Sequence, residues 1–267
     1  MQDRKKYTKY FYYLVIVFFF TETTISCSKT INVTDVPPYT NSPSSTDTSV
    51  NSSSSTDTSF IPPASTDTSV KTYLALGDSY TIGQSVPEED RFPEQTIQLL
   101  RNENIKISDP EIIATTGWTT GNLINALTLN PPQKHYSLVS LLIGVNNQYR
   151  GRSMDEYKTE FALLLNRSIQ YAGGNKKNVF VLSIPDYSVT PFARNSNKQK
   201  IAGEIDSFNV INKAISDSLG VNYLDVTAIS RDGLNDPELI SNDGLHPSGK
   251  QYKKWAELLA LMMKKSL

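Results

Sequence analysis

Short apolar runs alternate with segments of helical periodicity from Lys71 to the end of the chain. Five of these runs are short and bounded by turn residues. They predict buried strands at residues 73–76, 111–114, 138–143, 179–184 and 221–224.

Helices are predicted between these strands by polar caps at their starts and glycines at their ends. Ser153 and Glu156 form a capping-box pattern before a helix that runs to Gly173, and Ser248 with Gln251 precedes the last helix. The predicted buried stripes are Tyr157, Phe161, Leu164, Leu165 and Ile169 in the first helix, Ile201, Ile205, Phe208, Ile215 and Leu219 in a middle helix, and Tyr252, Trp255, Leu258, Leu259 and Met262 in the last. The strand–helix–strand spacing predicts right-handed crossovers and a parallel sheet with helices on both faces, which makes residues 71–267 one three-layer α/β/α domain.

A basic and then apolar segment opens the chain. Basic residues at positions 4, 5, 6 and 9 precede an apolar run over residues 10–20, and a short polar stretch leads to Cys27, the only cysteine. This order is typical of an export signal, and the run is about half of the ~20 residues that a membrane-spanning helix needs. An uncleaved N-terminal anchor is the alternative.

The four residues from Thr24 to Cys27 resemble a bacterial lipobox, in which the cysteine is lipidated and becomes the N-terminus. Thr24 departs from the Leu that is usual there. We expect residues 1–27 to be an export signal and the mature protein to be a lipoprotein at the cell envelope or cell surface, attached to the membrane through acyl chains on Cys27.

A Ser/Thr-rich stretch follows this signal. Of the 43 residues from 28 to 70, 21 are Ser or Thr and five are Pro, and one unit repeats every ten residues from Ser44. The repeats lack apolar residues to bury against one another, so residues 28–70 are predicted to be a disordered linker.

Charge and composition exclude several function classes. The whole chain has a formal net charge of −1, and residues 71–267 carry no net charge, whereas nucleic-acid binding needs a basic face. One Cys and two His exclude a Cys/His zinc cluster and a disulfide within the chain. We therefore expect no nucleic-acid partner, no metal site and no cofactor.

Unusual polar residues follow three of the predicted strands and precede the last helix. They form four blocks, Gly77–Tyr80, Thr116–Thr119, Gly144–Asn147 and Asp243–Pro247. In an open parallel sheet the active site forms at the carboxyl ends of the strands, which is where the first three blocks lie.

The chemistry of these blocks points to a serine nucleophile. A serine hydroxyl needs a base to remove its proton, and histidine is the usual base at neutral pH. Of the two histidines, His135 lies just before the amino end of the third predicted strand and is expected to be an exposed loop residue. His246 lies three residues after Asp243, a spacing that lets the carboxylate fix the tautomer of the imidazole. An Asx turn before the last helix is the structural alternative for this pair.

Attack on an ester creates an oxyanion, which needs hydrogen-bond donors that are placed before the reaction. The backbone N–H groups of Ser79 and Gly117 and the side-chain amide of Asn146 can supply them. Gly117 suits this role because an N–H without a neighbouring side chain can approach closely. Asp78 is expected to order its turn rather than to react.

In this order the four blocks resemble those of the GDSL, or SGNH, hydrolase family, and the resemblance covers nearly all of residues 72–262. It implies a flavodoxin-like fold with a parallel five-stranded sheet and a serine esterase that forms an acyl-enzyme. By this match Ser79 is the nucleophile, Asp243 and His246 complete a catalytic triad, and Ser79, Gly117 and Asn146 form the oxyanion hole.

Two positions depart from the family's pattern. Tyr80 replaces the Leu of GDSL, and Asn147 stands where the family usually has Asp, which affects the support of that loop rather than the chemistry. Arg150 and Arg152 follow the third block and can either contact an anionic group or remain solvated. The insertions after Ser79 and Asn147 are short, so the site is expected to be open and shallow.

The motifs leave the substrate open. We favour a small carboxylic ester, and either a lipid or an acetylated carbohydrate fits the resemblance. One alternative is an acyltransferase that passes the acyl group to a sugar hydroxyl, since the acyl-enzyme is shared. Another is a non-catalytic surface glycan-binding module, which predicts a missing triad member or an aromatic platform in its place, whereas Ser79, Asp243 and His246 are all present.

Overall fold

The computed structural model describes residues 69–267, so the expected export signal, Cys27 and almost all of the expected linker lie outside the described residues. Five parallel strands form one sheet in the order β2-β1-β3-β4-β5. The strands are β1 (Tyr73–Gly77), β2 (Glu111–Ala114), β3 (Leu138–Leu142), β4 (Val179–Leu182) and β5 (Asn222–Leu224). This order is the flavodoxin-like one, as the resemblance implied, and the predicted strands are confirmed to within two residues at each end.

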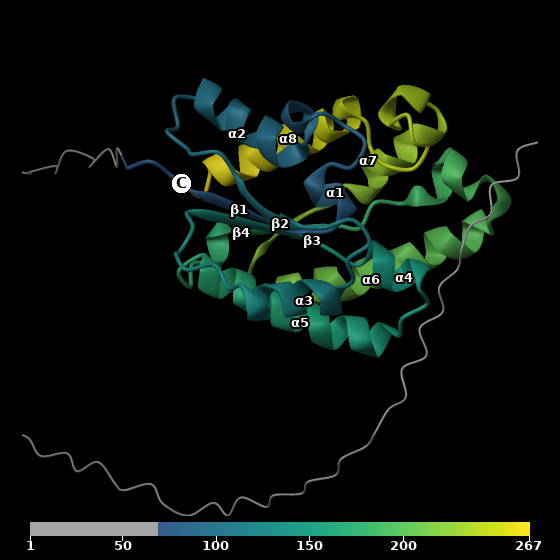
Figure 1. Cartoon of the computed structure of the whole chain (residues 1–267), viewed down its shortest axis with the longest axis horizontal. Helices are drawn as coiled ribbons and strands as arrows, with labels where there is room; N and C mark the ends of the chain where they lie inside the picture. The colour runs from purple at the N-terminus through teal and green to yellow at the C-terminus, as the bar shows by residue number, and fades with distance from the viewer. Residues whose placement is uncertain (1–68) are drawn as a thin grey trace, which may run out of the picture. The chain divides into compact units, whose positions relative to one another are not determined.

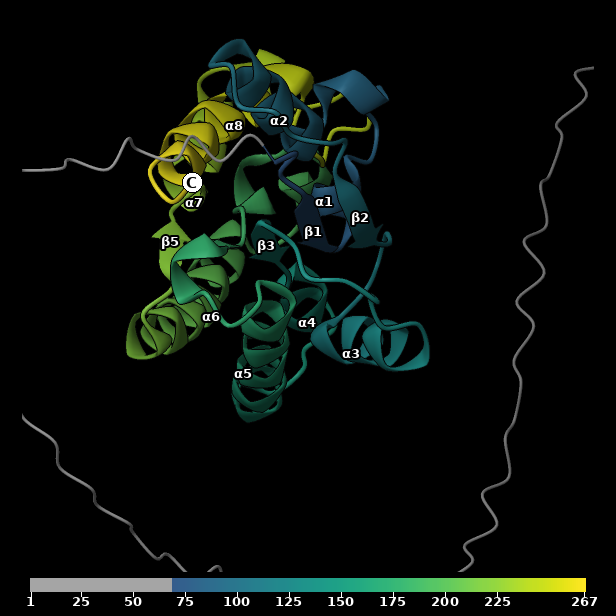
Figure 2. The same ribbon diagram turned by 90° about the vertical axis from the view of Figure 1, so that its left-hand side faces the viewer.

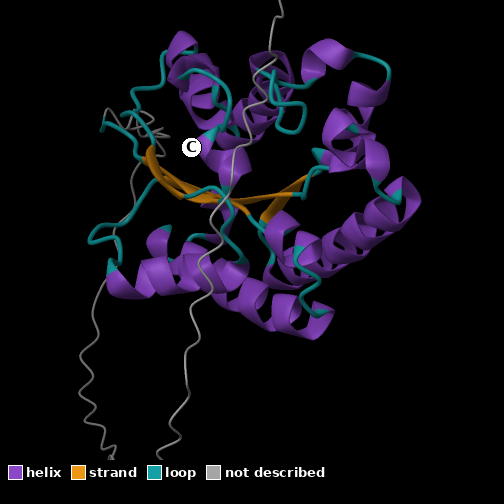
Figure 3. Ribbon diagram, turned by 45° about the vertical axis from the view of Figure 1, so that its right-hand side comes forward, coloured by secondary structure: helices purple, strands orange, loops and turns teal. Residues whose placement is uncertain are grey.

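Helices cover both faces of the sheet (Figures 1 and 3). The helices of the described residues are α1 (Ser79–Ile82), α2 (Phe92–Asn102), α3 (Thr120–Leu129), α4 (Val145–Tyr149), α5 (Met154–Tyr171), α6 (Lys198–Leu219), α7 (Thr227–Arg231) and α8 (Gly249–Lys264), with short 3-10 helices that include η3 (Tyr187–Val189) and η4 (Pro191–Asn195). In Figure 2, α2 and α8 lie on one face, and α3, α5 and α6 lie on the other. The three-layer α/β/α prediction is confirmed.

The central strands are almost entirely apolar, and the polar Ser140 of β3 shares a hydrogen bond of 2.7 Å with Tyr73 Oη. Every residue of β1, β3 and β4 is buried, whereas the edge strand β2 begins with an exposed Glu111. A parallel strand that is covered on both faces favours apolar side chains at nearly all positions, not only at alternate ones. The core is completed by Phe92, Tyr252 and Trp255 on the α2–α8 face and by Tyr157, Phe161 and Phe208 on the α5–α6 face.

The predicted stripe of the last helix is partly wrong. Leu258 is 41% exposed, and the fully buried methionine of α8 is Met263, not Met262. The small side chains of Ala256 and Ala260 are buried instead. Hydropathy alone favours the larger leucine at a buried position, so it does not identify these alanines.

Polar side chains fill part of the buried face of α6. Asn212 is fully buried, and its amide nitrogen donates to Tyr157 Oη at 3.2 Å while its oxygen accepts from Tyr223 Oη at 2.8 Å. The predicted Ile215 and Leu219 are only half-buried. Among residues 69–267, no helix is both long and apolar enough to cross a membrane.

Candidate active site

The first block turns sharply out of β1 into α1. Gly77 has no room for a side chain, because a Cβ there would lie 2.0 Å from Thr81 Oγ1. Asp78 caps α1 by accepting a hydrogen bond from the backbone N–H of Tyr80 at 3.0 Å. Ser79 is therefore the first helical residue beyond the strand, and its side chain lines a cavity at the carboxyl edge of the sheet.

Asp78 is fully buried beside this nucleophile candidate. Its Oδ2 atom has no hydrogen-bond partner among the described residues. Burial raises the pKa of Asp78 to about 7, although nearby backbone N–H groups, that of Tyr80 among them, act in the opposite direction. The structure agrees with the expected turn-ordering role, because the carboxyl faces the backbone of its own turn.

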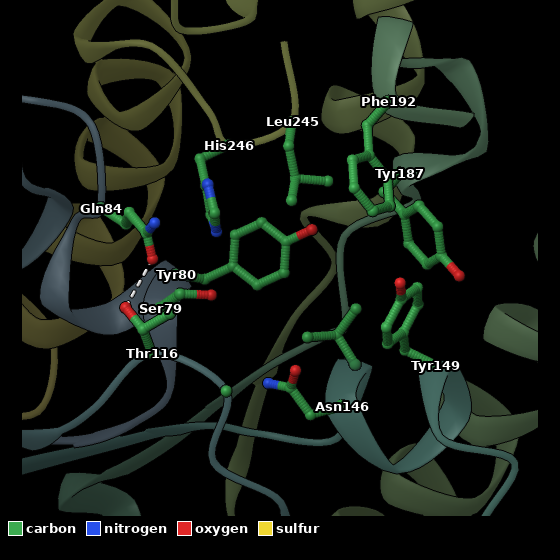
Figure 4. A pocket seen from close by; sticks show the side chains of 12 residues that line it. Ser79, Tyr80, Gln84, Thr116, Asn146, Tyr149, Tyr187, Phe192, Leu245 and His246 are labelled. Carbon is green, nitrogen blue, oxygen red and sulfur yellow. Dashed lines mark hydrogen bonds between the residues drawn. The ribbon is translucent and has the colours of Figure 1, made fainter. Parts of the chain in front are cut away.

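Asp243 and His246 are held together in the loop before α8. His246 Nδ1 lies 2.6 Å from Asp243 Oδ2, and Gly244 adopts φ +71°, which allows the chain to turn between them. Because an ionised carboxylate only accepts hydrogen bonds, Nδ1 carries the proton in this pair, and Nε2 is free to act as a base. Figure 4 shows the imidazole of His246 above Ser79, with a ring nitrogen directed at the serine hydroxyl.

The carboxylate of Asp243 is surrounded by donors. Its Oδ1 accepts from Ser241 Oγ at 2.7 Å and from the backbone N–H groups of Leu245 at 2.8 Å and His246 at 3.0 Å. Its Oδ2 accepts from Ser85 Oγ at 2.7 Å. Burial alone would raise the pKa of Asp243, but the hydrogen bonds from Ser85, His246 and Ser241 outweigh it and hold this pKa well below the ordinary value. Asp243 is thus a carboxylate at any pH near neutrality. Its backbone bonds are those of an Asx turn, so the structural alternative and the triad geometry are both present at this pair.

The candidate oxyanion donors lie on the same cavity. Gly117 adopts φ +82°, in the left-handed region that favours glycine, and the Asn146 amide nitrogen donates to the Trp118 carbonyl at 3.0 Å. That bond fixes the amide so that its nitrogen faces the Ser79 side of the pocket (Figure 4). The second hydrogen of the amide is left for a ligand.

Arg150 has a role that its sequence position did not indicate. Its guanidinium donates to the Gly117 carbonyl at 2.6 Å, so it contacts the loop of the second block. On the other side of this loop, Thr116 is hydrogen-bonded to the Gln84 side chain at 2.5 Å, as the dashed line in Figure 4 shows. Arg152 instead forms an ion pair on the surface, in which its Nη1 atom lies 3.9 Å from Glu156 Oε1.

Asn147 supports its loop although the family usually has Asp there. The side chain is fully buried, accepts from the backbone N–H of Thr120 at 3.0 Å and donates to Thr120 Oγ1 at 2.6 Å. This pair joins the third block to the start of α3. Thr120 therefore provides the hydrogen-bond partners that an Asn needs at position 147, where the family usually has Asp.

The cavity has a volume of about 220 Å³ and is open to solvent. Ser79, Gly117, Asn146 and His246 share it with an aromatic wall that the sequence did not indicate: Tyr149, Tyr187 and Phe192, whose ring centroids lie 6.1 to 6.3 Å apart. Tyr149 is 60% and Phe192 is 47% exposed, so two of these rings present apolar faces to solvent at the mouth. Val145 and Leu245 extend the wall, and an apolar part of a ligand fits against it.

The structure brings together all of the predicted site residues that it describes. Asp243 lies behind His246 rather than on the cavity surface. His135 is exposed before β3, as expected, and lines a different hollow with Pro132 and Gln170. Cys27 lies outside the described residues.

Comparison with known proteins identifies the family and the fold. Residues 75–254 match the sequence profile of the GDSL-like Lipase/Acylhydrolase family. No curated protein matches the chain in sequence.

Several solved structures share the fold. The psychrotrophic esterase EstA from Pseudoalteromonas sp. is 19% identical, with a TM-score of 0.55 over 73% of this chain and 97% of that chain. A variant of the acetyl xylan esterase Axe2 from Geobacillus stearothermophilus is 18% identical, with a TM-score of 0.57 over 72% and 94%. A lipase/acylhydrolase from Enterococcus faecalis is 16% identical, with a TM-score of 0.55 over 73% and 96%. At these identities the likeness shows the fold alone.

Proposed function

The chain belongs to the GDSL-like lipase/acylhydrolase family, and on that premise we propose that it is a serine esterase that hydrolyses carboxylic esters through a Ser79–His246–Asp243 triad and an acyl-enzyme. The observation that carries the proposal is the meeting of Ser79, His246 and Asn146 around one cavity, with Asp243 hydrogen-bonded behind the imidazole.

The first half of the reaction forms the acyl-enzyme. His246 Nε2 accepts the proton of Ser79 Oγ while that oxygen attacks the ester carbonyl carbon. The carbonyl oxygen becomes an oxyanion that accepts hydrogen bonds from the backbone N–H groups of Ser79 and Gly117 and from the Asn146 amide. The tetrahedral intermediate collapses, the bond to the alcohol oxygen breaks, and His246 gives its proton to the leaving alcohol.

Water completes the cycle by the same route. His246 takes a proton from water, the hydroxide attacks the acyl carbon, and Ser79 leaves with that proton. Asp243 keeps its negative charge throughout and stabilises each imidazolium, which the depressed pKa of its carboxyl supports.

The aromatic wall of Tyr149, Tyr187 and Phe192 favours a substrate with an apolar part, and the volume of about 220 Å³ favours a short or medium acyl group. For the alcohol portion we propose a lipid or a carbohydrate, the two substrate classes that the resemblance implies. A panel of esters from acetyl to long acyl, together with acetylated oligosaccharides, measures this preference directly. Addition of a sugar acceptor to the same assay detects acyl transfer, which would appear as an acylated sugar instead of free acid.

Substitution of the nucleophile tests the proposal. Ser79→Ala and His246→Ala should each lower kcat by at least about a thousandfold. His135→Ala serves as the matched histidine control and should retain full activity, because His135 lies away from the cavity. Activity of Ser79→Ala near that of the natural protein, in a preparation free of other esterases, would refute the mechanism. A folded protein with no activity on any ester would favour the glycan-binding alternative.

We also propose that the enzyme is exported and held at the membrane by acyl chains on Cys27, with residues 28–70 as a flexible linker. The support is sequence alone: one cysteine, placed directly after a signal-like segment whose apolar run is short. Intact-mass measurement of the native protein tests this. A mature chain that begins at Cys27 with added acyl mass supports it, and an unmodified Cys27 in membrane-associated protein contradicts it.

A further inference from the structure

The turn after α1 contains an unusual backbone conformation. Ser85 adopts φ +70°, and Asn104 is the other non-glycine residue with positive φ among the described residues. A residue with a Cβ is strained in this region, and such strain persists only where the surroundings impose it. Positions of this kind cluster at functional sites.

Ser85 reaches the triad carboxylate from a segment 158 residues away in sequence. Its hydroxyl donates to Asp243 Oδ2 at 2.7 Å, and that oxygen is also the one 2.6 Å from His246 Nδ1. The turn itself is tied to the nucleophile, because the backbone N–H of Gln84 donates to the Ser79 carbonyl at 3.0 Å. Ser85 thus links the turn that follows Ser79 to the loop that carries the acid and the base.

We propose that Ser85 is a positioning residue of the catalytic triad, which orients Asp243 Oδ2 on the imidazole of His246 through its hydroxyl. The proposal rests on the proposed esterase function. The left-handed backbone of Ser85 is what aims the hydroxyl at the carboxylate, which explains why a strained serine stands where glycine would be easier. Ser85 does not line the cavity, so it acts on the chemical step and not on substrate binding.

Ser241 provides a matched comparison on the same carboxylate. Its hydroxyl donates at the same distance, 2.7 Å, but to Oδ1, which also accepts from two backbone N–H groups. Loss of Ser241 therefore leaves Oδ1 held, whereas loss of Ser85 leaves Oδ2 with His246 as its only hydrogen-bond partner within the described part of the chain.

The experiment measures kcat and KM on a short-acyl ester for Ser85→Ala, Ser85→Gly and Ser241→Ala. A hydrogen bond to a charged group corresponds to about ten- to a hundredfold in rate, and the exposure of Ser85 lets water replace the hydroxyl in part. We therefore expect Ser85→Ala to lower kcat about tenfold with KM unchanged. Ser241→Ala should lower kcat less than about threefold.

Ser85→Gly separates the hydroxyl from the backbone. It relieves the strain at φ +70° and should be at least as stable as the natural protein, yet it should lose as much kcat as Ser85→Ala. Asn104→Gly relieves the same kind of strain far from the site and should leave kcat unchanged. In the proton NMR spectrum, the Nδ1–H resonance of His246 should move in both Ser85 variants and stay in place in Asn104→Gly.

Three outcomes would overturn the proposal: kcat of Ser85→Ala within twofold of the natural value, full kcat in Ser85→Gly, or an unmoved His246 resonance. These outcomes overturn the proposal for Ser85 when the Ser79→Ala variant is inactive, as the esterase mechanism requires. Full activity of Ser79→Ala would instead refute the proposed esterase mechanism, so the two failures are distinguishable.

Discussion

Substitution of Asn147 by Asp, the residue that the family usually has there, is expected to destabilise this protein. The reason lies in the direction of a short hydrogen-bond chain. Asn147 Nδ2 donates to Thr120 Oγ1 at 2.6 Å, and Thr120 Oγ1 donates to Glu160 Oε2 at 2.5 Å. The threonine hydroxyl has one hydrogen, which Glu160 already accepts, so Asn147 must be the donor of the pair.

Asn147→Asp replaces that donor by a second acceptor. The hydroxyl of Thr120 can then satisfy only one of two carboxylates, and a negative charge is placed at a fully buried position near Glu160. The change is nearly isosteric, so it opens no cavity. An unsatisfied buried group costs about 1–3 kcal/mol, and more when it is charged. At about 2–4 °C per kcal/mol for a domain of this size, a loss of about 2 kcal/mol lowers Tm by about 4–8 °C.

Thermal and denaturant unfolding at a pH near 8 measures this loss, and Glu160→Gln provides the control. In the double variant, the glutamine amide can donate to Thr120 Oγ1, and the hydroxyl can donate to the new carboxylate. We expect Glu160→Gln to restore most of the stability lost in Asn147→Asp, as a coupling energy in a double-mutant cycle. Equal stability of Asn147→Asp and the natural protein, or a double variant that is additive, would refute the reasoning.

Three further predictions concern the site. Burial raises the pKa of Asp78 to about 7 in the folded state, above the value of about 4 in an unfolded chain, so protonation of Asp78 stabilises the fold at low pH. This contribution is lost as the pH rises from about 4 to 7, and the natural protein should lose a few kcal/mol of stability relative to Asp78→Asn over that range. A constant difference in the free energy of unfolding between the two proteins would contradict this. Arg150→Ala should lower kcat by about three- to tenfold with little change in KM, since the Gly117 carbonyl loses its 2.6 Å contact; unchanged kcat would mean that the bond between Gln84 and Thr116 holds the loop without help. Phe192→Ala and Tyr149→Ala should raise KM for esters with longer acyl chains and leave acetyl esters nearly unaffected, and equal effects on both kinds of ester would place the acyl group elsewhere.

The strands of this fold could be predicted because a strand that is buried on both faces has a nearly continuous apolar sequence. β3 and β4 are buried at every position and were found within two residues of their ends. Helix faces were less readable. The buried side of α8 includes Ala256 and Ala260, which hydropathy ranks below the exposed Leu258. Burial depends on the direction in which a helical residue faces its neighbours, and the hydropathy of a single residue does not give that direction.

In the site, contacts within one loop could be predicted from the sequence, whereas contacts between distant segments could not. The pairing of Asp243 with His246 is a three-residue spacing in one loop, so the sequence could indicate it. The contacts of Ser85 with Asp243 and of Arg150 with Gly117 join segments 158 and 33 residues apart, and no spacing rule reaches that far. They depend on how loops from different strands meet at one edge of the sheet.

These long-range contacts follow from the topology of the sheet. β1 lies between β2 and β3, so the loops that follow these three strands converge at the point where the strand order reverses. Two of the groups proposed to act in catalysis are held by a segment that follows a different strand: Asn146 by the Trp118 carbonyl, and Gly117 by Arg150. Backbone hydrogen bonds order each segment internally, such as that from the Trp118 N–H to the Thr115 carbonyl, but they do not join the segments that follow these three strands to one another. The rigid sheet fixes where the loops begin, and the side-chain bonds between loops then fix the distances that an acyl-transfer site requires.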